Sequence, residues 1–317
     1  MTLTELKYIV AVARERQFGR AADACHVSQP TLSVAVKKLE DELDIKLFER
    51  SAGEVTPTPL GEEIVRQAQV VLEQAQAIRL IARRGKDPLA APLTLGVIYT
   101  IAPYLLPTLV RQVMARTPQM PLLLQEQFTV RLLDMLRSGE IDCAILAEPF
   151  PDSGLALAPL YSEPFVAAVP AKHALARGSH VSVEQLKRET MLLLGSGHCF
   201  RDQVLEVCPE FARLAADAQG IRRSFEGSSL ETIKHMVAEG MGVTLVPRLS
   251  VPVGGLDARA TSRRAADSHV RYLPLSGDVP TRRVVLAWRR SFTRYEAIAA
   301  LRNAVVACTL PGVTFLT

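Results

Sequence analysis

The chain has 317 residues, of which 48% are hydrophobic and 22% charged, and a formal net charge of +4. This composition predicts a soluble globular protein of two or three domains, and so weak a net charge indicates no particular partner. The chain begins without a signal peptide pattern, its longest apolar stretch (90–110) contains three prolines, and its five cysteines are odd in number. We therefore expect no membrane span, no disulfide scaffold and a cytoplasmic location.

The first sixty residues predict a helix-turn-helix followed by a small two-stranded wing. Apolar residues at helical spacing predict helices over 2–15, 18–25 and 29–43. Ser28 is a good N-cap for the third helix, and Pro30 fits its first turn, where a missing N–H costs nothing. From the pattern alone, a generic helical bundle with a hairpin remains the alternative.

The outward side of the third helix carries side chains suited to DNA contact. Gln, Thr and Ser near its N-terminus can reach base edges and phosphates, and lysines one to two turns later can meet phosphates. An arginine of the wing can touch phosphate or the minor groove. The candidates are Ser28, Gln29, Pro30, Thr31, Ser33, Val34, Lys37, Lys38 and Arg50. Because acidic residues balance the basic ones in this segment, DNA binding depends on where the charges lie.

A long helix is predicted from about residue 59 to residue 85. Its apolar residues keep a heptad-like spacing for more than three turns, and its other faces are rich in Gln, Glu and Arg. Too little chain precedes it to bury this stripe, so we expect the helix to pack against its copy in a dimer. The stripe comprises Leu60, Ile64, Ala68, Val71, Leu72, Ala75, Ile78 and Ile81. A hinge is expected at 85–88.

From residue 93 onward, predicted strands alternate with predicted helices, which indicates an α/β plan with parallel sheets. The expected strands are 93–99, 122–125, 142–147, 165–169, 191–194, 243–246 and 284–288. The expected helices are 103–116, 130–138, 183–188, 200–214, 229–239 and 292–307. Thr100 follows the first strand and Thr129 the second, so their hydroxyls can converge on a small polar ligand at the strand ends. Helix capping is the alternative role for Thr129.

Two cysteines, Cys199 and Cys208, flank a predicted helix. Cys199 is expected at its N-terminus with His198 and Arg201 beside it, and such surroundings lower the pKa of a thiol and favour its reactive form. An unbroken helix would separate the two residues by about 13.5 Å, whereas a disulfide needs Cα atoms within roughly 7 Å. The pair therefore predicts a redox switch that must refold its own segment. Two apolar residues of a core helix are the alternative.

A further pattern runs through the whole N-terminal segment. Its residues are Phe18, Ala21, Ala22, Val27, Ser28, Gln29, Pro30, Thr31, Leu32, Ser33, Leu39, Glu40, Leu43, Leu47, Phe48, Arg50, Thr58 and Gly61. On these residues the segment resembles the winged helix-turn-helix of the LysR-type transcriptional regulators. Asp44 stands where that family usually has glycine, but aspartate also tolerates left-handed geometry, so the fold should be undisturbed.

The resemblance extends along the entire chain and implies a fold. That fold is an α/β protein with an N-terminal winged helix-turn-helix, a long linker helix and an effector domain similar to periplasmic binding proteins, made of two α/β subdomains. The implied ranges are 1–58 for the DNA-binding domain, 59–88 for the linker and hinge, and 89–317 for the regulatory domain. Subdomain I would cover roughly 89–163 and 267–317, and subdomain II roughly 164–266.

Within that family, the middle of the chain resembles the hydrogen peroxide sensors. The motif is Gly197-His198-Cys199-Phe200-Arg201-Asp202-Gln203, with Cys208 at the matching distance. By this resemblance Cys199 is the thiol that peroxide oxidises, and Cys208 is the resolving thiol. Thr100, Thr129, His198 and one arginine, Arg282 rather than Arg283 by the motif around Pro280, would shape the peroxide pocket. Arg201 and Asp202 would belong to the environment of the thiol.

The same resemblance implies partners. They are double-stranded promoter DNA, RNA polymerase, hydrogen peroxide as the signal, thiol–disulfide reductants for reset, and further copies of the chain in a homotetramer built as a dimer of dimers. No cofactor, metal or membrane is implied, and the protein is expected to be no enzyme. Two alternatives stay open. A family member that senses a small organic ligand in the subdomain cleft would not need Cys208, and a peroxidase would not need the helix-turn-helix.

Overall fold

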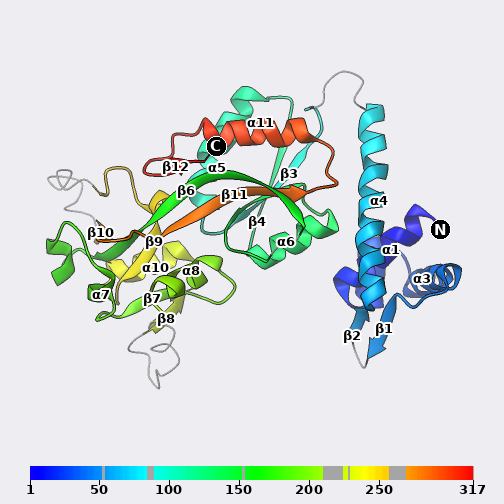
Figure 1. The fold of residues 1–317 in the computed structure, drawn as a ribbon, viewed down its shortest axis with the longest axis horizontal. Helices are drawn as coiled ribbons and strands as arrows, with labels where there is room; N and C mark the ends of the chain where they lie inside the picture. The colour runs from blue at the N-terminus through cyan, green and yellow to red at the C-terminus, as the bar shows by residue number, and fades with distance from the viewer. Residues whose placement is uncertain are drawn as a thin grey trace.

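The structure is a computed structural model, and it describes residues 1–51, 54–83, 89–151, 154–209, 224–227, 229–256 and 269–316. Figure 1 shows a helical unit at the N-terminus with the long helix α4, and a larger unit of sheet and helices. None of the helices that the structure describes has the length and apolar character needed to span a bilayer. The hinge predicted at 85–88 lies outside the described residues.

Three helices form the N-terminal unit, namely α1 (Leu3–Glu15), α2 (Phe18–Cys25) and α3 (Gln29–Leu43). The Ser28 side chain caps the start of α3, and Asp44 ends it in left-handed geometry with φ of 53°. These bounds confirm the three helices predicted from the apolar spacing. Asp44 thus adopts the left-handed conformation that aspartate tolerates better than most residues.

The wing is an antiparallel pair of strands, β1 (Phe48–Ser51) and β2 (Glu54–Pro57). It is fixed to α3 by Glu40, which is buried and accepts hydrogen bonds from the Leu47 amide at 2.8 Å and the Phe48 amide at 3.3 Å. Its other oxygen, Oε2, lies 3.6 Å from the Lys46 amine, so both oxygens of this buried carboxylate have a partner. Glu40 therefore sets the orientation of the wing relative to α3.

The long helix α4 (Pro59–Arg83) begins as predicted, but its apolar stripe is divided between two surroundings. Ala68 is buried in the core of the N-terminal unit, and Ile64 and Leu72 pack against that core. By contrast, Leu60, Val71 and Ile78 are exposed on the single chain. The expectation that too little chain precedes α4 to bury its stripe is therefore wrong for the half that faces the N-terminal unit. Only the other half remains for a partner.

Eight strands of the larger unit form one mixed sheet. They are β3 (Leu93–Ile98), β4 (Leu122–Gln127), β5 (Cys143–Ala147), β6 (Leu155–Pro170), β9 (Thr244–Pro247), β10 (Val270–Pro274), β11 (Thr281–Arg289) and β12 (Thr314–Phe315). The order is β10-β6-β11-β5-β3-β4, with β9 and β12 also paired to β6. A separate parallel pair is formed by β7 (Met191–Leu194) and β8 (Ser224–Gly227).

The helices of this unit lie between and around these strands. They are α5 (Ala102–Arg116), α6 (Thr129–Ser138), α7 (Val183–Leu186), α8 (Cys199–Val207), α10 (Leu230–Ala238) and α11 (Tyr295–Val306), with 3-10 turns η1 (Ala174–Arg177) and η2 (Arg248–Ser250). The predicted helix over 200–214 is described only to residue 209, and its last part lies outside the described residues.

The prediction of parallel sheets is correct only in part. β3, β4 and β5 run parallel, but β6 pairs antiparallel with β9, β10, β11 and β12. The strand predicted over 165–169 is only the second half of the 16-residue β6. Its first half contains prolines and polar residues that hide the strand pattern. β8, β10 and β12 were also missed, because short strands carry little periodic signal.

Two hydrophobic cores divide the larger unit. One contains β3, β5, α5 and α11 residues, and the other contains β7, β9 and α10 residues. β6 contributes Leu160 and Tyr161 to the first core and Phe165 to Val169 to the second. Figure 1 shows β6 and β11 as long strands that extend between the two parts of this unit. The domain boundaries given above stay predictions.

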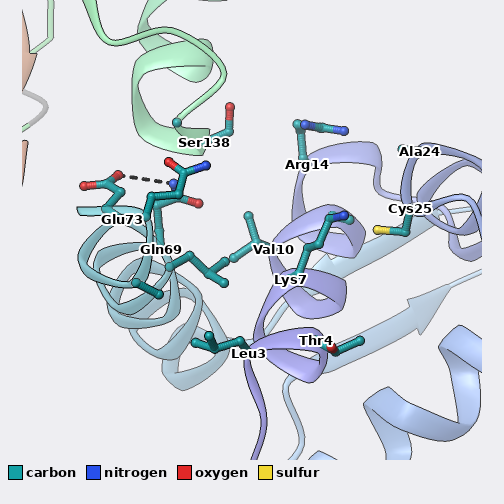
Figure 2. A pocket seen from close by; sticks show the side chains of 15 residues that line it. Leu3, Thr4, Lys7, Val10, Arg14, Ala24, Cys25, Gln69, Glu73 and Ser138 are labelled. Atoms are coloured by element: carbon teal, nitrogen blue, oxygen red, sulfur yellow. Dashed lines mark hydrogen bonds between the residues drawn. The ribbon is translucent and has the colours of Figure 1, made fainter. Parts of the chain in front are cut away.

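The linker helix also contacts the larger unit. The Glu73 carboxylate of α4 accepts a hydrogen bond from Gln69 at 3.2 Å, forms an ion pair with Arg289 and accepts a hydrogen bond from Ser291. A Cβ on Gly139 would lie 2.5 Å from Gln69 Nε2, so the end of α6 packs tightly against α4. Residues of α1, α2, α4 and the end of α6 line a cavity of about 480 Å³. Figure 2 shows the side chains around it.

Gly61→Ala is expected to destabilise the N-terminal unit. A Cβ at this position would lie 2.1 Å from the Leu47 carbonyl oxygen. This oxygen cannot easily move away, because it accepts a hydrogen bond from the Thr58 amide at 2.9 Å. We expect a loss of about 1–3 kcal/mol, as for other overpacked sites, measured by urea unfolding followed by circular dichroism.

Gly19→Ala is the matched control, because its Cβ would meet only Gln29 Oε1 at 3.6 Å. Alanine is the better helix former, so this variant should be as stable as the wild type or slightly more stable. A Gly61→Ala protein as stable as Gly19→Ala would contradict the tight approach of α4 to the wing.

Candidate functional site

Two buried threonines lie at the ends of neighbouring parallel strands. Thr100 comes two residues after β3, and Thr129 opens α6 two residues after β4. The strands pair Ile98 with Gln127, so these ends are adjacent. Thr129 does not cap its helix: Phe128 is the N-cap, and the Thr129 hydroxyl has no hydrogen-bond partner of good geometry among the described residues. The alternative capping role is therefore excluded.

Cys199 is the first residue of α8, and His198 is its N-cap. The His198 ring is buried and lies edge-on to Phe128, with ring centroids 4.8 Å apart, and to Tyr99 at 6.1 Å. Gly197 precedes it at φ of 95°, a conformation that favours glycine, with its missing Cβ 3.5 Å from the Phe128 ring. The start of α8 is thus packed against the aromatic residues that precede the two threonines.

The guanidinium of Arg282 is buried beside Thr100. Its Nη1 donates to the Thr100 hydroxyl at 2.9 Å, and its Nη2 donates to the Thr100 carbonyl at 3.1 Å. Its other edge contacts the Glu163 carboxylate. Arg283, in contrast, has an exposed side chain that pairs with Glu148 at 3.3 Å. Of the two candidate arginines, the structure places Arg282 beside Thr100.

A small cavity of about 10 Å³ joins these side chains. It is lined by Ile98, Tyr99, Thr100, Gln127, Phe128, Thr129, Gly197, His198 and Cys199. A volume of this order holds about one water-sized molecule. The cavity therefore admits only a very small polar ligand next to the Cys199 thiol.

The pKa of the Cys199 thiol is raised, which contradicts the prediction of a lowered value. Burial is the main cause, although the residue is partly exposed, and the charge of Asp202 adds to the rise. The nearby Thr129 hydroxyl and the Arg282 charge lower the pKa, but they do not offset burial. Arg201 is not among the groups that shift this pKa, and its Nη1 donates to the Leu194 carbonyl at 3.0 Å. Desolvation thus outweighs the helix N-terminus.

Cys208 lies at the other end of the same helix. It is the C-cap of α8, it is fully buried in the second core, and its amide donates to the Val204 carbonyl at 3.1 Å. Cys199 instead packs against the first core. The helix between them corresponds to a rise of about 13.5 Å, well beyond disulfide reach. All five cysteines lie within the described residues, and none is in a disulfide.

Sequence reasoning gave no role to four residues of this region, although Gln203 stood in the motif around Cys199. Tyr99 and Phe128 directly precede the two threonines, so their positions at the strand ends were a usable signal. Gln203 is buried and its Nε2 donates to the Glu148 carbonyl at 2.7 Å, which ties α8 to the segment after β5. Nothing in the local pattern singled out Glu163, because an isolated acidic residue is ordinarily a surface residue.

Apart from Arg50 of the wing, the residues predicted to contact DNA lie at the start or on the outer side of α3. Ser28, Gln29, Pro30, Thr31, Val34, Lys37 and Lys38 are exposed, and Ser33 is partly exposed. The Lys38 amine pairs with Glu5 at 3.3 Å, and the Ser28 hydroxyl is engaged with Thr31 at 2.8 Å. The side chain of Arg50 lies outside the described part of the structure. This face combines hydroxyl, amide and ammonium groups around one exposed apolar residue.

Comparison with known proteins agrees with this architecture. Residues 3–62 match the family model described as bacterial regulatory helix-turn-helix protein, lysR family, and residues 86–307 match the LysR substrate binding domain. The chain therefore belongs to the LysR family of DNA-binding transcriptional regulators.

Individual members of this family are similar to the chain over nearly its whole length. The chain is 38% identical over 302 residues to the hydrogen peroxide-inducible genes activator of Pectobacterium carotovorum, covering 94% of this chain and 95% of the relative. It is also 38% identical over 302 residues to the DNA-binding transcriptional dual regulator OxyR of Escherichia coli, covering 94% of each.

Among solved structures, a full-length OxyR cysteine-to-aspartate variant from Pseudomonas aeruginosa is 49% identical with a TM-score of 0.74, covering 98% of this chain and 99% of that one. A hydrogen peroxide-bound OxyR cysteine mutant from Corynebacterium glutamicum is 31% identical with a TM-score of 0.59, covering 96% of this chain and 91% of that one.

The raised pKa predicts how Cys199 responds to pH. Only the thiolate reacts, so its alkylation should keep accelerating as pH rises past the range where an ordinary cysteine is fully ionised. Thr129→Val removes a group that lowers this pKa, so the profile should move to still higher pH. Alkylation is measured at the Cys199 peptide by mass spectrometry.

Thr108→Val is the matched control, because the Thr108 hydroxyl bonds to the Leu105 carbonyl within α5 and is no cause of the shift at Cys199. Its profile should coincide with that of the wild type. A Thr129→Val profile that moves to lower pH would contradict the role given to that hydroxyl.

Proposed function

We propose that this LysR-type regulator senses hydrogen peroxide through reversible formation of a Cys199–Cys208 disulfide and controls antioxidant genes. The observation that carries the proposal is the water-sized cavity at the Cys199 thiol, lined by two threonines and closed by His198. Hydrogen peroxide is a small polar molecule of about that size, whereas an organic metabolite is far larger. The relatives named for hydrogen peroxide-inducible genes agree with this ligand.

The side chains around the cavity suit the reaction of a thiolate with peroxide. The Thr129 hydroxyl is buried beside the Cys199 thiol and has no other hydrogen-bond partner among the described residues, so it can turn towards a ligand at that thiol. Arg282 donates to the oxygen of the Thr100 hydroxyl, which leaves the proton of that hydroxyl available to donate. Donors aimed at the leaving oxygen stabilise the negative charge that develops as the O–O bond breaks.

Two steps then form the bond. The Cys199 thiolate attacks one oxygen of hydrogen peroxide, the O–O bond breaks, and the products are a sulfenic acid and hydroxide, which takes a proton to become water. The Cys208 thiol attacks the sulfenic sulfur and releases a second water as the disulfide forms. Each chain thus loses two electrons to one peroxide. A dithiol reductant restores both thiols by disulfide exchange.

The disulfide is incompatible with the reduced helix. Both cysteines terminate α8, and each packs on a different hydrophobic core. Bringing the sulfurs together requires the helix between them to unravel and Cys208 to leave the second core. The Gln203 contact to Glu148 is then expected to break as well. The change therefore reaches both cores of the regulatory domain.

The conformational change would alter DNA binding through the arrangement of the subunits in the oligomer. The exposed Leu60, Val71 and Ile78 lie on one side of α4 and fit a helix–helix contact with a second copy of the chain. In a dimer of dimers, a change in the regulatory domains alters the spacing of the helix-turn-helix units, which selects the operator and the recruitment of RNA polymerase. The proposal therefore includes assembly into a homotetramer, and it places the protein in the cytoplasm.

Stoichiometric peroxide tests the proposal. One equivalent per chain should remove two thiols, yield a Cys199–Cys208 peptide in mass spectrometry and change the DNA footprint of the same sample. Cys208→Ser should stop at the sulfenic acid of Cys199 and keep the reduced footprint. Cys25→Ser is the matched control and should behave as wild type.

Three results would contradict the proposal. Disulfide formation with an unchanged DNA footprint would show that the disulfide does not control DNA binding. Induction that survives Cys208→Ser would favour an organic ligand in the cleft. Sustained consumption of excess peroxide in the presence of reductant would favour a peroxidase.

A further inference from the structure

The carboxylate of Glu163 is buried deep between the two cores, next to Arg282. Both side chains are fully buried, and the two residues are directly paired across β6 and β11. Glu163 Oε2 accepts from Arg282 Nε at 2.8 Å and lies 2.7 Å from Arg282 Nη2. Its other oxygen, Oε1, accepts the Leu249 amide at 2.7 Å. Every oxygen of this carboxylate is therefore engaged with a donor.

These contacts leave the guanidinium a single orientation. The edge formed by Nε and Nη2 faces Glu163, so only Nη1 and the second proton of Nη2 remain for other acceptors. Both are directed at Thr100, whose hydroxyl and carbonyl accept them. The Arg282 Cζ atom lies over the ring of Phe200, the residue that follows Cys199, at 5.4 Å from the ring centroid.

We infer that Glu163 is a positioning residue for the reaction of Cys199 with peroxide: it holds Arg282 edge-on so that Nη1 points at the Thr100 hydroxyl that lines the cavity. This inference rests on the proposed function. Glu163 does not line the cavity and acts only through Arg282. Without its carboxylate, Nε and Nη2 of the guanidinium lose the oxygen that both of them contact, and no other acceptor among the described contacts fixes that edge.

The inference predicts different effects on two reactions of Cys199, oxidation by peroxide and alkylation. The reaction with peroxide needs donors placed at the leaving oxygen, whereas alkylation by a bromobimane reagent needs only the thiolate and access. A displacement of Arg282 should therefore slow the first reaction much more than the second. A merely structural ion pair would affect both reactions equally, through unfolding.

The experiment compares both second-order rates in the full chain for wild type, Glu163→Gln and Arg282→Gln. We expect Glu163→Gln to slow oxidation by peroxide about tenfold to a hundredfold, as misplaced catalytic groups do, with little change in alkylation. The double variant should be no slower than Arg282→Gln alone, because residues that act through one another are not additive. Glu148→Gln, which breaks the ion pair of the neighbouring Arg283, should match wild type in both rates.

Three outcomes would overturn the inference: a wild-type peroxide rate in Glu163→Gln, equal slowing of both reactions, or effects of the two substitutions that multiply. If Glu163→Gln does not fold, as breaking a buried pair can cause, Glu163→Asp replaces it. Its shorter carboxylate should give an intermediate peroxide rate with unchanged alkylation, and a wild-type peroxide rate would overturn the inference. Failure of wild-type Cys199 to react with peroxide would instead reject the proposed function itself.

Discussion

The structure depends on one short helix that belongs to two cores. α8 places Cys199 against the first core and buries Cys208 in the second, and it holds the two residues apart by its own length. A helix of this length is marginal alone, so its stability comes from Phe200 and Val204, which are buried in the second core. A covalent bond between its ends therefore competes directly with tertiary packing. In the proposed switch, this competition carries a change at two sulfur atoms to both cores of the larger unit.

The environment of the thiol favours selectivity over general reactivity. Burial raises the pKa of Cys199, so little thiolate is present at neutral pH and most electrophiles react slowly. A raised pKa is compatible with fast oxidation only when neighbouring groups stabilise the transition state. In the proposed reaction, Thr100, Thr129 and the Arg282–Glu163 pair supply such groups beside a cavity of water-sized volume. Size and donor geometry, rather than thiol acidity, thus distinguish the proposed signal.

Much of this architecture could be predicted from sequence, for physical reasons that differ between elements. The bounds of α3 followed from Ser28 and Asp44, because capping preferences act locally. The convergence of Thr100 and Thr129 followed from the rule that parallel strands end at one edge.

What could not be predicted depends on tertiary structure. The antiparallel course of β6 and the buried Glu163–Arg282 pair arise from residues far apart in sequence. The pKa of Cys199 was predicted with the wrong sign, because the burial that governs it is invisible until the two cores are in place.

Hydrogen exchange within α8 tests the central claim most directly. The amides that close this helix, among them Cys208 bonded to the Val204 carbonyl, should be protected in the reduced protein. After complete oxidation by peroxide, mass spectrometry of the peptides that span residues 199–208 should show that this protection is lost. Retained protection of the helix in a fully disulfide-bonded sample would contradict the account, because the bond would then have formed without unravelling the helix.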